Sequence, residues 1–284
     1  WVLVHGDTAT STAAALTAFF AGCKVGHVEA GLRTYNKWSP FPEEMNRQLT
    51  GRLADMHFAP TERARQNLLQ EGVETSNIVV TGNTVIDALY QSVNIVNRDE
   101  YTNEEIENLK SILDFHKDFV LVTGHRRENF GQGFVDICHA LKEIAQRRTD
   151  IQIIYPVHLN PNVQQPVNEI LTGVPNIYLI PPLNYPSFVW AMDKARIIIT
   201  DSGGVQEEAP SLGKPVLVMR DTTERPEAVE AGTVILVGTD RKKIVSETMS
   251  LLDDPSRYAA MSHIENPYGD GHACKRIVET LKNE

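Results

Sequence analysis

The strongest constraint on the fold is a repeated alternation of short apolar runs with helical patterns. Ile197–Ile199 is a typical run, and a helical pattern follows it directly. Strands covered by helices on both faces read as continuous apolar runs, and strand–helix alternation is typical of parallel sheets. The predicted strands are residues 1–5, 24–29, 56–59, 78–81, 119–123, 151–156, 177–180, 197–200, 216–219 and 234–237.

A charged helical stretch without a strong strand pattern separates two blocks of this alternation, and 284 residues are enough for two domains. We predict an α/β fold with two Rossmann-like parallel-sheet domains facing across a cleft. These are residues 1–85 and 118–262, joined by a helical linker at 86–117. Residues 263–284 end in a helix that we expect to pack back on the first domain. Because Trp1 already lies in a strand pattern that reads as buried, we expect part of the first domain to precede it.

Composition excludes several classes of partner. The net charge of −10 does not suit a nucleic-acid or acidic-membrane surface, which needs a basic face. The three cysteines lie far apart without metal-ligand spacing, as expected of free thiols in the cytoplasm. There is no apolar run of the roughly 18 residues that span a membrane. No GxGxxG or Walker A motif is present, so neither a bound nicotinamide cofactor nor ATP hydrolysis is expected. No carboxylate cluster has the spacing of a metal site, so no metal is expected.

One stretch, Thr200–Glu208, reads as a strand end, a two-glycine turn and a helix start. Such a helix start presents unpaired N–H groups and the positive end of the helix dipole, which together favour an anion. Gly203 and Gly204 carry no Cβ that would hold a phosphate away. A carboxylate of Glu207 or Glu208 would repel a phosphate, so one of them is interpreted as a ribose-hydroxyl acceptor. A purely structural strand-to-helix turn is the alternative.

Other polar clusters also follow predicted strands. Ligands of open α/β sheets bind beyond the carboxyl ends of the strands, so the clusters predict a cleft walled by both domains. His125, Arg126 and Arg127 stand out, because adjacent arginines at such an edge favour an anion. The clusters are His5–Thr8, His27–Arg33, Gly124–Asn129, Pro156–His158, Asp201–Glu208 and Arg220–Pro226.

Several of these polar residues also have purely structural interpretations. Asp7 could cap the helix that follows it. Glu29 could form an ion pair with Arg33, and Glu43 could simply be an acidic residue in a first helical turn. His158 taken alone is as consistent with an ordinary loop histidine as with a ligand contact. The residues by themselves leave these alternatives open.

Seven motifs in order along the chain resemble the bacterial non-hydrolysing UDP-N-acetylglucosamine 2-epimerases. The resemblance implies a glycosyltransferase-B-like fold with the active site between two domains. It implies interconversion of UDP-N-acetylglucosamine (UDP-GlcNAc) and UDP-N-acetylmannosamine (UDP-ManNAc), through elimination and re-addition of UDP, with no cofactor. The motifs are His5–Thr8, His27–Thr34, Pro42–Arg47, Thr81–Asp87, Gly124–Asn129, Asp201–Pro210 and Thr223–Ala228.

The resemblance also assigns roles to individual residues. The catalytic residues correspond to Asp7, Glu29, Glu43 and His125. Regulatory contacts to a second UDP-GlcNAc correspond to Glu43, Arg126 and His158. The substrate contacts correspond to Phe188, Ser202, Gly203, Gly204, Glu208 and Arg225.

The resemblance further implies a homodimer and a role in making surface polysaccharide. The family's first strand and its Gly-Thr-Arg-Pro-Glu loop have no counterpart here, in line with the expected missing portion. Three alternatives stay open: a hydrolysing 2-epimerase, a glycosyltransferase of the same fold, and a sugar-nucleotide-binding protein without activity.

Overall fold

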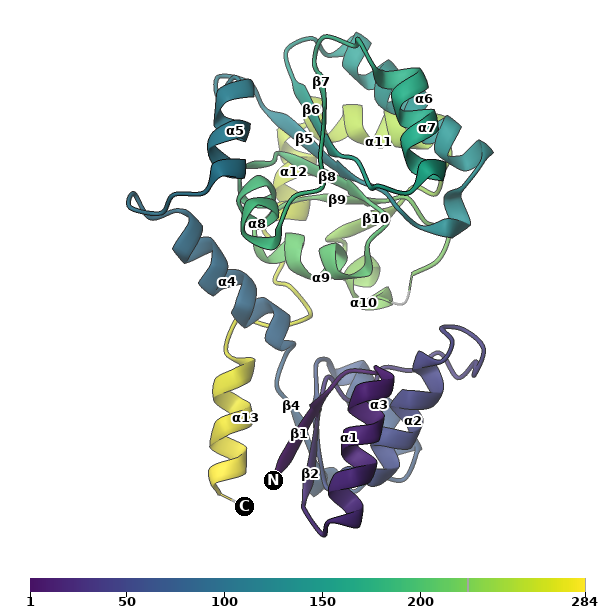
Figure 1. Cartoon of the computed structure of the whole chain (residues 1–284), viewed down its shortest axis with the longest axis vertical. Coiled ribbons are helices and arrows are strands. Elements are labelled where there is room, and N and C mark those ends of the chain that lie inside the picture. The colour runs from purple at the N-terminus through teal and green to yellow at the C-terminus, as the bar shows by residue number, and fades with distance from the viewer. Residues whose placement is uncertain (224, 284) are drawn as a thin grey trace. The chain divides into compact units, whose positions relative to one another are not determined.

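The computed structural model describes residues 1–223 and 225–283, and Glu224 of the Thr223–Ala228 motif lies outside the described residues. The chain divides into two compact units (Figure 1). Unit 1 consists of residues 1–88 and 267–283, and unit 2 is Leu89–Asn266. Each contains one sheet of parallel strands, so the predicted α/β class with two parallel sheets is confirmed.

The elements of unit 1 follow the predicted alternation closely. Helix α4 starts in unit 1 and continues into unit 2. The elements are β1 (Val2–His5), α1 (Ala9–Phe20), β2 (Val25–Val28), α2 (Glu43–Leu53), β3 (Met56–Ala59), α3 (Glu62–Gln70), η1 (Thr75–Asn77), β4 (Ile78–Val80), α4 (Thr84–Val96) and α13 (Ala273–Lys282).

Unit 2 begins within α4 and contains the remaining elements. They are α5 (Glu104–Ile112), β5 (Phe119–Thr123), η2 (Arg127–Asn129), α6 (Gln132–Arg147), β6 (Gln152–Pro156), α7 (Pro161–Leu171), β7 (Ile177–Ile180), α8 (Tyr185–Lys194), β8 (Ile197–Thr200), α9 (Gly203–Ser211), β9 (Val216–Val218), α10 (Pro226–Ala231), β10 (Val234–Leu236), α11 (Arg241–Asp253) and α12 (Pro255–Ser262).

The sheet of unit 2 is doubly wound, in the order β10-β9-β8-β5-β6-β7. The direction of winding reverses between β5 and β8, which are paired along their length. Such a reversal opens a crevice at the carboxyl ends of the two strands, where ligands of this fold class bind. Helices α6, α7 and α11 cover one face, and α8, α9 and α10 lie on the other (Figure 1).

Unit 1 has a smaller sheet in sequence order, β1-β2-β3-β4. Helices α1 and α2 pack against each other, and Ala15 and Ala18 of α1 join Val4 and Val25 in one apolar cluster. Ile277 of α13 packs with Met56 and Phe58. The carboxylate of Asp87 accepts the amides of Ala273 and Cys274 at 3.0 and 2.9 Å, which anchors the start of α13.

The edge strands correct one expectation. Trp1–His5 was expected to be a buried strand, but β1 lies at the edge of its sheet, with Leu3 48% exposed and Val4 buried. Strands β4, β7 and β10 are also edge strands and are partly exposed, whereas β5 and β8 are almost wholly buried. An apolar run indicates a strand but not its place in the sheet, which depends on its neighbours.

Among the described residues, no helix is both long and apolar enough to span a bilayer. The described part of the chain also contains no group of three or more His, Cys, Asp or Glu side chains suited to a metal ion.

Candidate functional site

At the end of β1, Asp7 is held by a side chain from α2. Its Oδ2 accepts hydrogen bonds from Arg47 Nη2 at 2.7 Å and Nε at 2.9 Å, and Asn46 Nδ2 donates to its carbonyl at 2.8 Å. The cap of α1 is Thr8, whose Oγ1 accepts the Ser11 amide. The helix-cap interpretation of Asp7 is therefore wrong. The carboxylate is oriented by Arg47 and its side chain stays 27% exposed.

Glu29 follows β2, the strand next to β1, and so lies at the same edge of the sheet as Asp7. A Cβ on Gly6 would come within 3.0 Å of Glu29 Oε2, so the absence of a side chain at Gly6 makes room for this carboxylate. Gly6 itself has φ of +66°, which favours glycine. Glu29 has φ of +63°, an uncommon value for a residue with a side chain and one found often at functional sites. Asn83 Nδ2 donates to Glu29 Oε1 at 3.2 Å.

The alternative ion pair between Glu29 and Arg33 is absent from the described residues. Arg33 instead makes a two-pronged pair with Glu71, with nitrogen–oxygen distances of 2.6 and 2.8 Å. This guanidinium is fully buried. Burial lowers the pKa of His27 to about 4, and the positive charge of Arg33 acts in the same direction. Burial likewise lowers the pKa of His57, its partner in β3, to about 4.

The adjacent glutamates at the start of α2 differ in their surroundings. Glu44 is fully buried and accepts the amides of Thr34 and Tyr35 at 3.0 and 3.1 Å. Burial alone would raise the Glu44 pKa, but these hydrogen bonds outweigh it and lower the pKa. Glu43 is partly exposed and has no ion-pair or hydrogen-bond partner among the described residues. Glu43 lies one helical turn before Arg47, the partner of Asp7, so the Glu43 and Arg47 side chains are on the same side of α2.

In unit 2 the loops after β5 and β8 are tied together by Asp201. Its fully buried carboxylate accepts the amides of His125 and Arg126, both at 2.8 Å. The loops leave the sheet where its winding reverses, so the His125 motif and the two-glycine turn meet at this edge.

The rings of His125 and His158 stack, with centroids 5.6 Å apart and planes inclined by 24°. His158 Nδ1 accepts the Asn160 amide at 3.1 Å, which fixes the ring in its loop. The residue predicted as catalytic and one predicted as regulatory thus contact each other within unit 2.

Two arginines lie at the start of α9. A Cβ on Gly203 would lie 3.5 Å from Arg225 Nη1 and 3.7 Å from Arg126 Nη2. Ser202 is the N-cap of α9, but its side chain makes no capping hydrogen bond within the described chain. Two guanidinium groups thus lie beside a helix start, a combination that suits a phosphate or diphosphate.

The two glutamates of α9 have different partners. Glu207 binds Arg225 Nε at 2.7 Å and so holds that guanidinium in place. Glu208 accepts the Tyr185 hydroxyl at 2.8 Å, and burial, with Glu207 nearby, raises the Glu208 pKa. Phe188 is partly buried and lies three residues after Tyr185 on α8, hence on the same side of that helix.

The motifs named above include Arg47, Asn83 and Asp201, but the sequence predicted no orienting role for them, nor for Tyr185. Arg47 follows Glu43 by four residues in a predicted helix, and that spacing was a usable signal. Tyr185 had the equivalent signal, three residues before Phe188. The partners of Asn83 and Asp201 come from distant segments and left no local signal.

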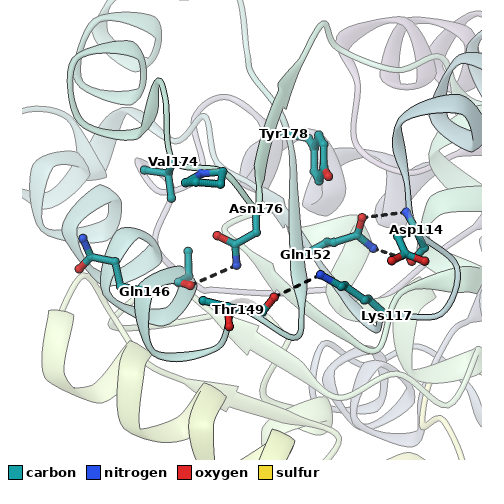
Figure 2. A pocket seen from close by; sticks show the side chains of 10 residues that line it. Asp114, Lys117, Gln146, Thr149, Gln152, Val174, Asn176 and Tyr178 are labelled. Carbon is teal, nitrogen blue, oxygen red and sulfur yellow. Dashed lines mark hydrogen bonds between the residues drawn. The ribbon is translucent and has the colours of Figure 1, made fainter.

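A separate pocket of about 520 Å³ lies at the opposite edge of the same sheet, next to the start of β6 and β7 (Figure 2). Its polar side chains bind the protein's own backbone. Gln152 exchanges two hydrogen bonds with Asp114, and Asn176 Nδ2 donates to three carbonyls. The pocket offers no cluster of reactive groups and is distinct from the crevice beside His125.

The two parallel sheets, one of them doubly wound, define an α/β protein. A model of the family described as UDP-N-acetylglucosamine 2-epimerase matches residues 1–282. The chain belongs to this family, and the predicted family, isomerase class and glycosyltransferase-B-like fold class are confirmed.

Individual relatives agree with this assignment. A UDP-N-acetylglucosamine 2-epimerase of Escherichia coli K12 is 61% identical over 282 residues, covering 99% of this chain and 75% of the relative. A crystal structure of the Neisseria meningitidis enzyme bound to UDP-GlcNAc is 50% identical, with a TM-score of 0.90, over 100% of this chain and 76% of that one. The structure of the Methanocaldococcus jannaschii enzyme in complex with UDP-GlcNAc and UDP is 37% identical, with a TM-score of 0.78. The match covers 100% of this chain and 75% of that one.

Proposed function

We propose that this chain catalyses the reversible, non-hydrolysing epimerisation of UDP-GlcNAc to UDP-ManNAc. The observation that carries the proposal is the pairing of two kinds of site in one family member. In unit 1, Asp7 and Glu29 follow two neighbouring parallel strands, and Glu43 has no partner among the described residues. Unit 2 has a helix start flanked by Arg126 and Arg225.

The chemistry explains why both are needed. The C2 proton of a pyranose is not acidic, because no carbonyl lies next to C2. Breaking the C1–O bond to UDP gives C1 oxocarbenium character, which acidifies that proton. A carboxylate accepts it, leaving 2-acetamidoglucal and free UDP. Return of a proton to C2 from the opposite face, with re-addition of UDP to C1, gives the epimer.

The residues are proposed to divide this work. Arg225, held by Glu207, Arg126 and the first amides of α9 stabilise the charge on the departing diphosphate. The Glu208 carboxylate accepts a ribose hydroxyl. Asp7, Glu29 and Glu43 supply acid and base groups for the two faces of C2, and His125 assists at the leaving group.

The regulatory role of Glu43, Arg126 and His158, the homodimer and the uracil contact of Phe188 are part of the same proposal. The contact between the His125 and His158 rings supports a link between regulation and catalysis. Through that stacking, a ligand on His158 would alter the orientation of His125.

The test replaces each acid by its amide. Asp7→Asn, Glu29→Gln and Glu43→Gln should each lower turnover of UDP-GlcNAc by at least about a hundredfold. Glu62→Gln, on the exposed Glu62–Arg65 pair of α3, is the matched control and should keep full activity. Turnover within a few fold of the unsubstituted protein in all three variants would remove these residues from the mechanism.

The product distinguishes the remaining alternatives. NMR of the reaction in D₂O, with UDP-GlcNAc as sole substrate, should show UDP-ManNAc carrying deuterium at C2. Free N-acetylmannosamine with UDP would indicate the hydrolysing reaction instead. UDP binding in calorimetry without exchange at C2 would indicate a binding protein or a transferase.

A further inference from the structure

The buried carboxylate of Asp201 contacts the His125 loop with each of its oxygens in a different way. Oδ2 accepts both loop amides at 2.8 Å, and Asn129 Nδ2 lies 3.4 Å from it. Oδ1 lies 3.3 Å from His125 Nδ1. One oxygen therefore holds the backbone of the loop, and the other faces the imidazole.

The second oxygen lacks a donor. Oδ1 of Asp201 is buried and has no hydrogen-bond partner within residues 1–223 and 225–283. A buried carboxylate oxygen without a donor is costly, and His125 Nδ1 lies just beyond ordinary hydrogen-bond length. A small rotation of the ring closes this distance. The Nδ1 position then carries the proton.

We propose that Asp201 is a positioning residue that keeps neutral His125 in the Nδ1–H form. Nε2 then carries the lone pair on a ring that is 43% exposed, while the stacked His158 fixes the ring plane. This inference rests on the proposed function for its catalytic consequence. Protonated His125 would donate from Nε2 to the departing diphosphate, and neutral His125 would recover that proton there.

The substitution Asp201→Asn separates the two oxygens. An asparagine whose oxygen replaces Oδ2 keeps both amide hydrogen bonds of the loop. Its NH₂ group replaces Oδ1 and donates to Nδ1, which forces the Nε2–H form. The loop stays in place while the imidazole acquires the opposite tautomer.

The direct test is ¹⁵N NMR of histidine-labelled protein at about pH 8, where an ordinary histidine is neutral. His125→Ala identifies the His125 signals. We expect Nδ1–H in the unsubstituted protein and Nε2–H in Asp201→Asn. An Nε2–H form in the unsubstituted protein overturns the inference, whether or not Asp201→Asn folds.

The kinetic test compares kcat with UDP affinity. Asp201→Asn should lower kcat by about a hundredfold, as expected for loss of an oriented acid–base group, and change the UDP dissociation constant by less than about threefold. In a His125→Ala background it should lower kcat no further, because Asp201 acts through His125. Asp150→Asn, an exposed carboxylate of unit 2, is the control and should change neither.

Equal losses of kcat in the presence and absence of His125 would overturn the positioning role and indicate a general effect on the loop. The failure of the proposed function would look different. UDP-GlcNAc would remain unchanged in the unsubstituted protein, while the tautomer measurement would still decide the structural inference.

Discussion

The two units differ in what fills the space around their sheets. Unit 2 has one large apolar cluster, in which Val120, Ile153, Ile199 and Leu217 of four strands meet the helices on one face. Unit 1 has several small clusters and buries His27, His57, Glu44 and Arg47 among them. Unit 2 also buries charged groups, among them Asp201, Glu207 and Glu208, so the units differ in the size of their apolar clusters, while both depend on polar groups that must be satisfied in place.

The sites differ in the same way. In unit 2 the winding reversal places the His125 and Gly203 loops together, and Asp201 then fixes their details. Unit 1 has no reversal among its described strands, and side chains from α2 and from the loop before α4 orient the acids. Topology therefore accounts for the position of one site, and a hydrogen-bond network accounts for the other.

The largest expected effect is on the apolar core of unit 2. Phe134→Ala removes a fully buried ring of α6 and should cost about 3–5 kcal/mol, because a cavity remains in a close-packed cluster. Hydrogen exchange followed by mass spectrometry should show reduced protection in β5, β6 and β8, with unit 1 unchanged.

The control is Phe19→Ala on α1, whose ring is 56% exposed and should matter by less than about 1 kcal/mol. If Phe134→Ala also cost less than about 1 kcal/mol of stability, the unit 2 cluster would be loosely packed and the contrast between the units would be wrong.

The next effect is acid sensitivity confined to unit 1. His27 and His57 have pKa values near 4 in the folded protein and an ordinary value near 6.5 when unfolded. The unfolded chain binds more protons between these values, so this stability is present above about pH 6.5 and is lost toward pH 4. Each histidine should contribute up to about 3 kcal/mol to the loss.

Hydrogen exchange at pH 7 and at pH 5 measures the stability of each unit separately. In unit 2, burial raises the pKa values of Cys138 and Glu208. The thiol therefore stays neutral, and the raised pKa of Glu208 makes unit 2 more stable, not less, as the pH falls. Substituting both histidines by Gln should flatten the pH dependence of unit 1. The exposed His116→Gln should leave it intact. Equal acid sensitivity of both units would contradict the prediction.

The smallest effect should be the same in both units, because helix caps are local. Thr8 caps α1 through the Ser11 amide, and Asp240 caps α11 through the amides of Lys242 and Lys243. Thr8→Ala and Asp240→Ala should each cost about 1 kcal/mol. Urea unfolding, followed by hydrogen exchange in each unit, measures the free-energy cost of both substitutions. Costs that differ by more than about 1 kcal/mol would show that the surrounding unit affects its caps.

Much of the fold was predictable from periodicity. The apolar runs identified the strands of both sheets. The partial exposure of the edge strands β7 and β10 was not predictable, because edge and centre strands carry the same kind of run. Which strands become neighbours is decided by contacts between segments far apart in the chain.

The candidate site divides in the same manner. The sequence by itself determined the types of residue at the strand ends: Asp7 and Glu29 after two strands, and glycines at the start of α9. The partners were decided by the tertiary structure. Asp7 meets Arg47, 40 residues away, and Arg33 selects Glu71 rather than Glu29.

The physical reason is one of range. Backbone periodicity, turns and caps follow from neighbours within a few residues, so they can be read from the sequence. The orientation of a carboxylate depends on which donors the folded chain brings within about 3 Å of it. Glu43 and Glu44 are adjacent in the sequence, yet Glu44 is buried and accepts two backbone amides, whereas Glu43 stays partly exposed.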